Sequence, residues 1–291
     1  MSVPKISIIT PSYAQGHFLE ETINSVLGQR YPELEYIVID GGSKDESVSI
    51  IRKYEERLAY WVSEPDRGQV HAINKGLEKA TGDLVAFINS DDVYLPGAFS
   101  SVAQFFEQNK SCNWLCGDTI LFGHEGQPTQ LIQANVPKTA AHCLSWAYTA
   151  PQPGMFWRRE LLRSGFQERW RYCFDHDLYV RLLLEGHSCE HLPTPVAAYR
   201  LHKASKTVAD SPEFDKEFDS IVEVYEEQLR GSGKRWCAAT RLLRLSYSAS
   251  TTGKRSEALG YLFRAFIKHP EGVRHRPFWG CLRRLVLPGA Y

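Results

Sequence analysis

Short apolar runs alternate with amphipathic stretches over the first hundred residues, and this alternation limits the folds open to the chain. The apolar runs, which have the length of buried strands, are 6–10, 35–40, 59–63 and 84–88. The stretches between them with helical spacing of apolar positions are 18–27, 46–54 and 70–80. Strands that are joined through helices pair in parallel, so the pattern predicts an α/β fold with a mostly parallel sheet and helices on both faces.

The fourth apolar run leads directly into two adjacent carboxylates, Asp91 and Asp92. Ligands of open α/β sheets bind beyond the carboxyl ends of the strands, which is where this pair is expected. Two like charges are costly there unless a cation neutralises them, and hard oxygen ligands suit a divalent metal. Aspartates are also common in the turn that follows a strand. The stretch alone therefore leaves a metal site and a capped turn both open.

Composition excludes some classes of protein. The chain has 291 residues, with 34 Lys and Arg against 34 Asp and Glu, so its formal net charge is zero and a general nucleic-acid binder is disfavoured. Seven cysteines without a CxxC pair predict neither a zinc site nor a disulfide framework, as in a reducing compartment. The first residues lack the apolar core of a signal peptide, and no apolar run reaches the ~18 residues of a membrane span. We therefore expect a cytoplasmic protein.

Other polar residues follow the predicted strands. Asp40 precedes two glycines, and its carboxylate can accept a hydrogen bond from a base or a ribose, or from the backbone of a turn. Arg67 follows the third strand and is suited to a phosphate, although an isolated arginine is more often a solvated surface charge. The GxGxxG fingerprint and the P-loop motif are both missing from the sequence. An NAD enzyme and a P-loop kinase are therefore not supported.

Five segments, taken in order, resemble glycosyltransferase family 2. They are 7–13, 36–43, 63–69, 72–76 and 82–92, and the likeness covers residues 5–205. Members of this family are inverting enzymes of the GT-A fold that use nucleotide-sugar donors. The resemblance therefore implies a GT-A (Rossmann-like) catalytic domain and a nucleotide-sugar donor.

The resemblance also implies roles for individual residues. Those implied to bind the nucleotide sugar are Thr10, Pro11, Tyr13, Asp40, Arg67, Asn89 and Asp91. Thr10 and Asp40 would hold the base. A carboxylate can accept the imide N–H of uracil or thymine, so Asp40 favours a donor with one of these bases. The residues implied to bind Mn²⁺ or Mg²⁺ are Asp91, Asp92 and His202. Asn89 stands where many members have the first aspartate of the metal motif, so it leaves open which of Asp91 and Asp92 is the direct ligand.

The region after the predicted strand 113–118 is expected to build the acceptor site. Trp146 can stack on a sugar ring and Gln152 can bond its hydroxyls, although aromatic packing explains such residues equally well. At the position of the family's ED motif, Phe174 replaces the acidic first residue and Asp175 takes the place of the general base. Asp177 is assigned to the acceptor side or to capping of the following helix, and His176 is the alternative base.

The C-terminal part is predicted to be helical. Residues 218–229 form an amphipathic stripe, and helices at 235–248 and 255–268 form a hairpin. The tail 278–287 mixes apolar and basic residues, and either lies on an anionic membrane surface or packs on the domain. We expect a catalytic domain over 1–210, with nucleotide-sugar binding in 1–118 and the acceptor region in 119–210, followed by a helical extension over 211–291.

The sequence thus predicts an inverting glycosyltransferase with a UDP- or dTDP-linked donor, a divalent metal on the diphosphate, and Asp175 as general base. The implied partners are a glycan or glycolipid acceptor and, through the C-terminal helices, the inner face of the cytoplasmic membrane. Two alternatives are a sugar-phosphate nucleotidyltransferase and a non-catalytic sugar-binding protein of the same fold. The loop after the first strand has no Lys or Arg for a nucleotidyltransferase phosphate loop.

Overall fold

The computed structural model describes residues 3–123, 129–145, 148–202, 205–206, 211–271, 279 and 282–283. The chain divides into two compact units. Unit 1 comprises Met1–Lys138 and Tyr148–Phe218, and unit 2 comprises Thr139–Ala147 and Asp219–Tyr291.

Unit 1 is built on one mixed sheet to which nine strands of the described residues belong. The strands are β1 (Ile6–Ser12), β2 (Leu34–Asp40), β3 (Tyr60–Ser63), β4 (Leu84–Phe87), β5 (Val93–Tyr94), β6 (Trp114–Phe122), β7 (Gln130–Ile132), β8 (Met155–Arg158) and β9 (Cys189–Arg200). Their order across the sheet is β3-β2-β1-β4-β8-β6-β9-β5, and β7 pairs with β6. The predicted α/β class is confirmed.

The four strands that alternate with helices are parallel, as predicted. Beyond β4 the sheet becomes mixed: β8 is antiparallel to both β4 and β6, whereas β6 and β9 are parallel. The strands β5, β7 and β8 were not predicted from the sequence. They are only two to four residues long, so their strand conformation depends on pairing with β9, β6 and β4 more than on a local pattern.

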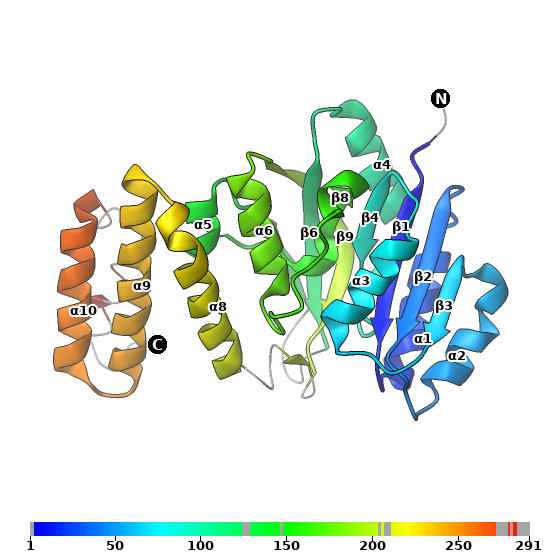
Figure 1. Ribbon diagram of the computed structural model, residues 1–291, viewed down its shortest axis with the longest axis horizontal. Coiled ribbons are helices and arrows are strands. Elements are labelled where there is room, and N and C mark those ends of the chain that lie inside the picture. The colour runs from blue at the N-terminus through cyan, green and yellow to red at the C-terminus, as the bar shows by residue number, and fades with distance from the viewer. Residues whose placement is uncertain are drawn as a thin grey trace. The chain divides into compact units, whose positions relative to one another are not determined.

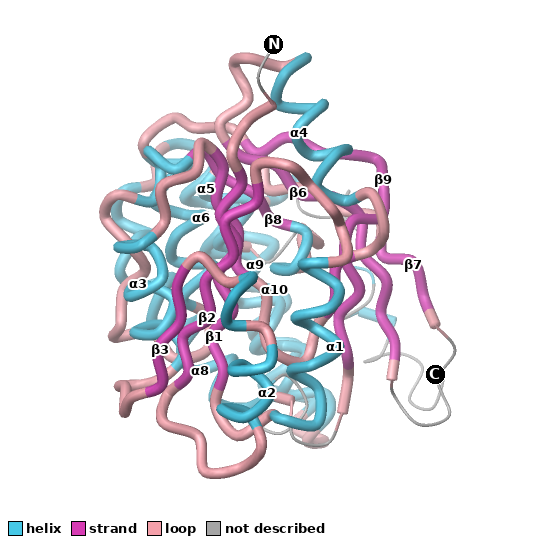
Figure 2. Tube along the Cα trace, turned by 90° about the vertical axis from the view of Figure 1, so that its right-hand side faces the viewer, coloured by secondary structure: helices cyan, strands magenta, loops and turns pink. Residues whose placement is uncertain are grey.

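Helices cover both faces of the sheet in unit 1 (Figures 1 and 2). The helices of this unit are α1 (Gly16–Leu27), α2 (Ser47–Lys53), α3 (Gln69–Lys79), α4 (Ala98–Gln108), α6 (Phe174–Leu184) and the first half of α8 (Ser211–Tyr225). Figure 2 shows the strands between α1 and α4 on one side and α3 and α6 on the other. This arrangement agrees with helices that cross over between parallel strands.

Alternation along β1 distributes its side chains between the two layers. Ile8 belongs to the core cluster that the sheet forms with α1, α2 and α4. Ile9 points to the opposite face, where a Cβ atom on Gly76 of α3 would lie 2.4 Å from Ile9 Cγ2. Glycine at this position therefore allows α3 to lie close to the sheet. On the same face, Phe87 of β4 stacks parallel to Trp157 of β8.

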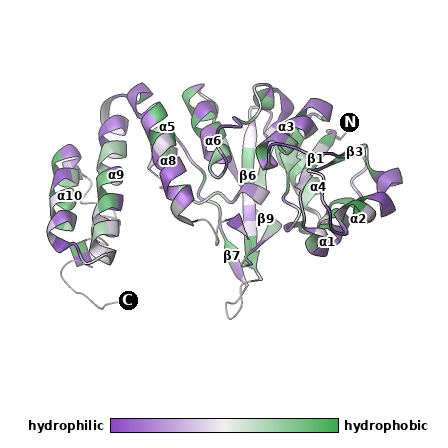
Figure 3. Ribbon diagram, turned by 60° about the horizontal axis from the view of Figure 1, so that its bottom comes forward, coloured by the Kyte–Doolittle hydropathy of each residue, from purple (hydrophilic) through white to green (hydrophobic). Residues whose placement is uncertain are grey.

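Unit 2 is helical, as predicted. It contains α5 (Ala140–Leu144), the second half of α8, α9 (Gly231–Thr251) and α10 (Arg255–Lys268). The helices α9 and α10 form the predicted hairpin, and they pack through Ala239 and Leu243 against Leu262 and Ala265. The turn between them uses Gly253 at a φ of +78°, a backbone conformation that favours glycine. Figure 3 shows both hydrophobic and hydrophilic residues along α10.

Candidate active site

The carboxyl ends of the parallel strands bring the predicted nucleotide-binding residues together. In the register of the sheet, Ser12 lies beside Asp40, and Asp40 lies beside Ser63. The segment from Asn89 to Asp92 follows β4, the other neighbour of β1. The topology therefore places these polar groups along one edge of the sheet, where α/β proteins bind ligands.

Asp40 is fully buried and is bonded by the turn that follows β2. Its Oδ2 accepts the backbone N–H groups of Gly42 (3.1 Å) and Ser43 (2.9 Å) and the hydroxyl of Ser63 (2.6 Å). Its Oδ1 accepts the hydroxyl of Ser43 at 2.5 Å. Asp40 therefore accepts hydrogen bonds from the backbone of the turn that follows it, which is one of the roles considered from the sequence. A carboxylate offers about four acceptor positions, so these four hydrogen bonds occupy the buried Asp40 carboxylate within the turn.

The other predicted base-binding residues differ in exposure. Thr10 is buried, and its hydroxyl lies 3.0 Å from the hydroxyl of Tyr36. Pro11 is buried in β1, whereas Tyr13 is 68% exposed. A Cβ atom on Gly41 would lie 3.2 Å from the Tyr13 ring, so this glycine allows the ring to approach the end of β2. An exposed aromatic ring beside a strand end is suited to stacking on a base.

Arg67 is exposed and forms a bidentate pair with Glu168. Its Nε and Nη2 each lie 2.9 Å from a carboxylate oxygen of Glu168. The hydrogen bond between them raises the pKa of Arg67 and lowers that of Glu168. The sequence did not indicate Glu168 as a partner, because 101 residues separate the two. A diphosphate that binds Arg67 would have to displace the carboxylate of Glu168. Because ion pairs between exposed side chains contribute little stability, this displacement would cost little free energy.

Asp91 and His202, which the sequence analysis assigned to a metal site, lie side by side. Oδ2 of Asp91 is 3.0 Å from Nε2 of His202, and Nε2 of Gln15 lies 3.4 Å from the same oxygen. The His202 ring packs on Phe18 with ring centroids 4.8 Å apart. A separation of about 3.0 Å is also that of adjacent ligands in an octahedral shell with bonds of about 2.1 Å.

Asp92 is turned away from this pair. Its Oδ1 accepts the backbone N–H of Arg200 at 2.9 Å, and its Oδ2 accepts Nδ2 of Asn89 at 3.3 Å. Burial, followed by the charge of Asp91, raises the pKa of Asp92 well above its usual value. Its bond to the end of β9 gives Asp92 a role in the arrangement of the site.

The donor set fits a divalent metal that the protein holds through two ligands. Among the described residues, no group of three His, Cys, Asp or Glu side chains is arranged to hold a metal ion. Asp91 and His202 supply one hard oxygen and one imidazole nitrogen, which both Mn²⁺ and Mg²⁺ accept. Cations of this type often take their remaining ligands from substrate phosphates and water.

A chain of hydrogen bonds leads from the loop after β4 to the segment that precedes α6. Asn89 Oδ1 accepts Nε2 of Gln69 at 2.6 Å, and Oε1 of Gln69 accepts the Lys206 ammonium at 2.7 Å. The same ammonium lies 3.4 Å from the carbonyl oxygen of Arg171. Gln69 and Lys206 were not predicted as site residues: Gln69 ends the segment 63–69 but was given no role there, and Lys206 lies outside the five segments.

Asp175 lies in the first turn of α6 and is partly exposed. Its carboxylate accepts the backbone N–H of His176 at 2.9 Å. Burial raises the pKa of Asp175; the charge of His176 opposes this and that of Glu217 adds to it. A carboxylate with free acceptor positions and a raised pKa is suited to take a proton.

Asp177 connects side chains within the core of unit 1, and the expectation that it caps α6 is wrong. Its buried carboxylate accepts Nε1 of Trp170 (2.8 Å) and Nε of Arg181 (2.8 Å). The N-cap residue of α6 is Cys173, without a side-chain capping bond. Asp177 pairs with Arg181 because residues four apart meet on one face of a helix. The neighbouring His176 places Nδ1 2.6 Å from the hydroxyl of Tyr148.

The remaining acceptor-side predictions are Gln152 and Trp146. Nε2 of Gln152 donates to the carbonyl oxygen of Phe87, the last residue of β4, at 2.8 Å. Its Oε1 is buried without a partner. Trp146 lies outside the described residues.

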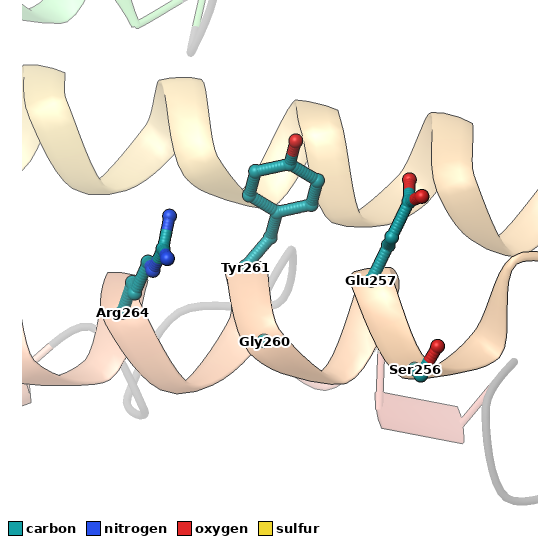
Figure 4. Close-up of a pocket in the computed structure, with 5 residues that line it drawn as sticks. All are labelled: Ser256, Glu257, Gly260, Tyr261 and Arg264. Atoms are coloured by element: carbon teal, nitrogen blue, oxygen red, sulfur yellow. The ribbon is translucent and has the colours of Figure 1, made fainter.

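A separate cavity of about 360 Å³ belongs to unit 2 (Figure 4). It is lined by five residues of α10: Ser256, Glu257, Gly260, Tyr261 and Arg264. None of the residues predicted to bind the nucleotide sugar or the metal lines it.

The sheet and helices of unit 1 have the GT-A fold, with polar groups gathered at the strand ends. Solved structures support this fold: S. aureus TarS 1–349 in complex with UDP-GlcNAc matches with a TM-score of 0.67 at 20% identity, over 92% of this chain and 82% of that chain. A mannosyltransferase from Pyrobaculum calidifontis, PcManGT in complex with GDP-Man and Mn²⁺, matches with a TM-score of 0.54 at 18% identity, over 100% of this chain and 89% of the other.

The chain belongs to glycosyltransferase family 2, whose model matches residues 7–165. An uncharacterized glycosyltransferase of Nostoc sp. is 28% identical over 215 residues, which are 69% of this chain and 66% of the relative. The GalNAc(5)-diNAcBac-PP-undecaprenol beta-1,3-glucosyltransferase of Campylobacter jejuni is 34% identical over 106 residues, which are 35% of this chain and 34% of the relative. The chain thus spans about one third to two thirds of the length of the curated relatives that it matches first.

Proposed function

We propose that this chain is an inverting glycosyltransferase that moves a sugar from a nucleotide-diphosphate donor to an acceptor hydroxyl. The observation that carries this proposal is the chain of hydrogen bonds from Asn89 through Gln69 and Lys206 to the Arg171 carbonyl. It connects the loop that contains Asp91 with the segment that precedes Asp175. One site would thus contain both a donor-binding edge and a carboxylate that is able to act as a base.

The donor is proposed to be a UDP- or dTDP-linked sugar. Thr10, Pro11 and Asp40 would surround the base, and Asp40 would accept the imide N–H of uracil or thymine in exchange for one of its hydrogen bonds within the turn. Tyr13 would stack on the base. The likeness to TarS, whose complex contains UDP-GlcNAc, supports this class of donor.

Arg67 would bind the diphosphate of the donor, together with a divalent metal. We assign Asp91 and His202 as metal ligands, with Asp92 holding the end of β9 beside them. When bound, Mn²⁺ or Mg²⁺ neutralises the charge that develops on the leaving diphosphate. Asn89 would contact the ribose or the metal-bound diphosphate while it keeps its bond to Gln69.

The transfer step needs a base, because a sugar hydroxyl is a poor nucleophile at neutral pH. Asp175 would accept the proton of the acceptor hydroxyl as its oxygen attacks the anomeric carbon. The bond from that carbon to the β-phosphate oxygen breaks with its electron pair, and the nucleoside diphosphate leaves. Attack on the face opposite to the leaving group inverts the anomeric configuration.

The acceptor is proposed to be a glycan or glycolipid bound in the region 119–210. Gln152 remains a proposed contact of the acceptor, and Asp177 would act by orienting Trp170. The Campylobacter jejuni relative has an undecaprenol-linked glycan in its name, which supports an acceptor of the lipid-linked kind.

A peripheral membrane contact is proposed for unit 2. On α10, four apolar residues are exposed at helical spacing: Leu259, Phe263, Phe266 and Ile267. Arg255, Arg264 and Lys268 belong to the same helix, and a basic helix with an apolar stripe binds anionic lipid surfaces.

Most of the tail 278–287, to which the sequence assigned this contact, lies outside the described residues. No helix in the described ranges is long and apolar enough to cross a bilayer. The proposed location is the inner face of the cytoplasmic membrane.

The donor proposal is tested by thermal shift with UDP-, dTDP- and GDP-linked sugars, each with and without Mn²⁺. We expect a UDP- or dTDP-sugar to raise the melting temperature and the metal to increase the effect. The active donor is then used to label an acceptor, and NMR of the product gives the anomeric configuration. A larger shift with GDP-sugars contradicts the assignment of the base, and a retained configuration contradicts the mechanism. Incorporation from a nucleoside triphosphate and a sugar phosphate identifies a nucleotidyltransferase instead.

A further inference from the structure

Three consecutive backbone N–H groups donate to one carboxylate, that of Glu217. The N–H of Arg171 donates to Oε2 at 2.8 Å, and those of Tyr172 and Cys173 donate to Oε1 at 2.7 and 2.6 Å. The donors belong to the segment directly before α6, and the acceptor belongs to α8. Hydrogen bonds to an ionised acceptor are about twice as strong as neutral ones, so this carboxylate restricts the segment strongly.

The same helix contacts the segment at further points. The ring of Phe214 packs on that of Tyr172 with centroids 5.0 Å apart, and the thiol of Cys173 lies 3.6 Å from the carbonyl oxygen of Phe214. On the other side of Asp175, the ring of His176 meets that of Phe218 at 5.4 Å. The first half of α8 therefore contacts the chain both before and after Asp175.

The same contact also reaches the N-terminus of α6. Cys173 is its N-cap residue and makes no side-chain capping bond. The N-terminus of a helix has unpaired donors and a positive partial charge, which a nearby carboxylate stabilises. Glu217 supplies the stabilising carboxylate. It belongs to α8, lies 44 residues after Cys173 in the sequence, and accepts the backbone N–H of this N-cap residue.

We propose that Glu217 is a positioning residue, which holds the segment 171–173 and thereby fixes the orientation of Asp175 toward the acceptor hydroxyl. This inference rests on the proposed role of Asp175 as the base. Among the described residues, the donors to the carboxylate of Asp175 are backbone N–H groups of its own helical turn, so its direction is set by its backbone.

Glu217 also affects the acidity of the base. The charged groups that act on Asp175 are His176, from its own helix, and Glu217, from α8. Burial raises the pKa of Asp175 most, His176 lowers it, and the negative charge of Glu217 raises it further. Removal of that charge should therefore lower the pKa of Asp175 and allow it to ionise at a lower pH.

The test compares Glu217→Gln with Glu217→Asp and with Glu213→Gln, a matched control on the same helix. Glu213 is exposed and pairs with Lys216 on α8 itself. The amide that replaces the carboxylate in Glu217→Gln offers one oxygen, so at least one of the three N–H groups loses its acceptor. We expect faster hydrogen exchange at residues 171–173, a turnover lower by about 10²-fold with unchanged donor affinity, and an acidic limb of kcat/KM at lower pH. Glu217→Asp keeps the charge and should keep the position of that limb, while Glu213→Gln should match the wild type.

The double variant Asp175→Asn with Glu217→Gln separates the two proposals. If Glu217 acts through Asp175, Glu217→Gln lowers turnover in the wild type and has no further effect in the Asp175→Asn background. An equal loss in both backgrounds overturns the positioning role, as do unchanged exchange, turnover and pH profile in a folded Glu217→Gln variant. Hydrogen exchange does not depend on activity. A normal turnover of Asp175→Asn would instead reject the proposed base, whatever the exchange data show for Glu217.

Discussion

Nε2 of His202 lies 3.0 Å from Oδ2 of Asp91, although 111 residues separate them in the sequence. Asp91 follows β4 and His202 follows β9, two strands that are not adjacent in the sheet. Asp92, next to Asp91, instead bonds the backbone of Arg200. Two adjacent aspartates of one motif thus have different environments, and substitutions at each should have different effects.

Asp91→Ala and His202→Ala should each weaken Mn²⁺-dependent binding of UDP by at least about 10- to 100-fold, since even residues that only support a metal ligand have effects of that size. The fold should remain intact, because both side chains lie at the end of the sheet. Calorimetric titration of UDP with and without Mn²⁺ measures the effect, and Glu107→Ala, an exposed position of α4, is the control. Wild-type affinity in both variants would reject the metal site.

Asp175→Asn should lower turnover by about 10²–10⁴-fold, the usual contribution of a general base. Donor affinity should not change, because Asp175 would contact the acceptor and not the nucleotide. Transfer of labelled sugar at saturating donor gives the rate, and a separate titration gives the affinity. Glu185→Gln, at the exposed C-terminal end of the same helix, should behave as the wild type. If His176→Ala is inactive while Asp175→Asn is active, the base is the histidine.

Asp177→Asn should mainly reduce stability, by about 3–5 kcal/mol, because it leaves the largely buried Arg181 without its carboxylate partner. Chemical denaturation measures the free energy of unfolding. Arg181→Met removes the cation as well as the pair, and the double variant with Asp177→Asn should therefore lose less than the sum of the two single changes. Additive losses would show that the pair is not coupled.

The ionisation of Glu35 should make the free energy of unfolding depend on pH in the acidic range. Burial opposes its ionisation, but bonds from Lys5, Ser7 and Thr81 lower the pKa of this largely buried carboxyl from 4.5 to about 2. The folded state therefore binds this proton less tightly than the unfolded chain. The resulting stabilisation, about 3 kcal/mol, is present in full above about pH 4.5 and is lost as the pH falls toward 2.

The free energy of unfolding of the wild type and of Glu35→Gln, measured between pH 7 and pH 3, tests this dependence. The difference between the two proteins should shrink as the pH falls. Glu33→Gln, an exposed neighbour, should change neither the stability nor its slope. A constant difference over the whole range would show that Glu35 is not the group responsible.

The sequence by itself determined the parallel half of the sheet and the position of the edge at which we propose that the donor binds. The apolar runs of β1, β2 and β4 and the helices between them are local patterns, and parallel topology aligns the ends of such strands. The C-terminal hairpin could be predicted for the same reason, because Ala258, Leu262 and Ala265 recur at helical spacing and are buried.

Only the tertiary structure decided the partners of the polar residues. The sequence motif does not distinguish the role of Asp91 from that of Asp92. The sequence around Asp177 is equally compatible with a helix cap and with a partner of Arg181 and Trp170. Glu217 and Glu168 carry no local signal at all, and the short strands β5, β7 and β8 are extended because their neighbours pair with them. A hydrogen bond or an ion pair acts over about 3 Å in space. The separation of its partners along the chain is set by the packing of the whole fold, which no local window of sequence contains.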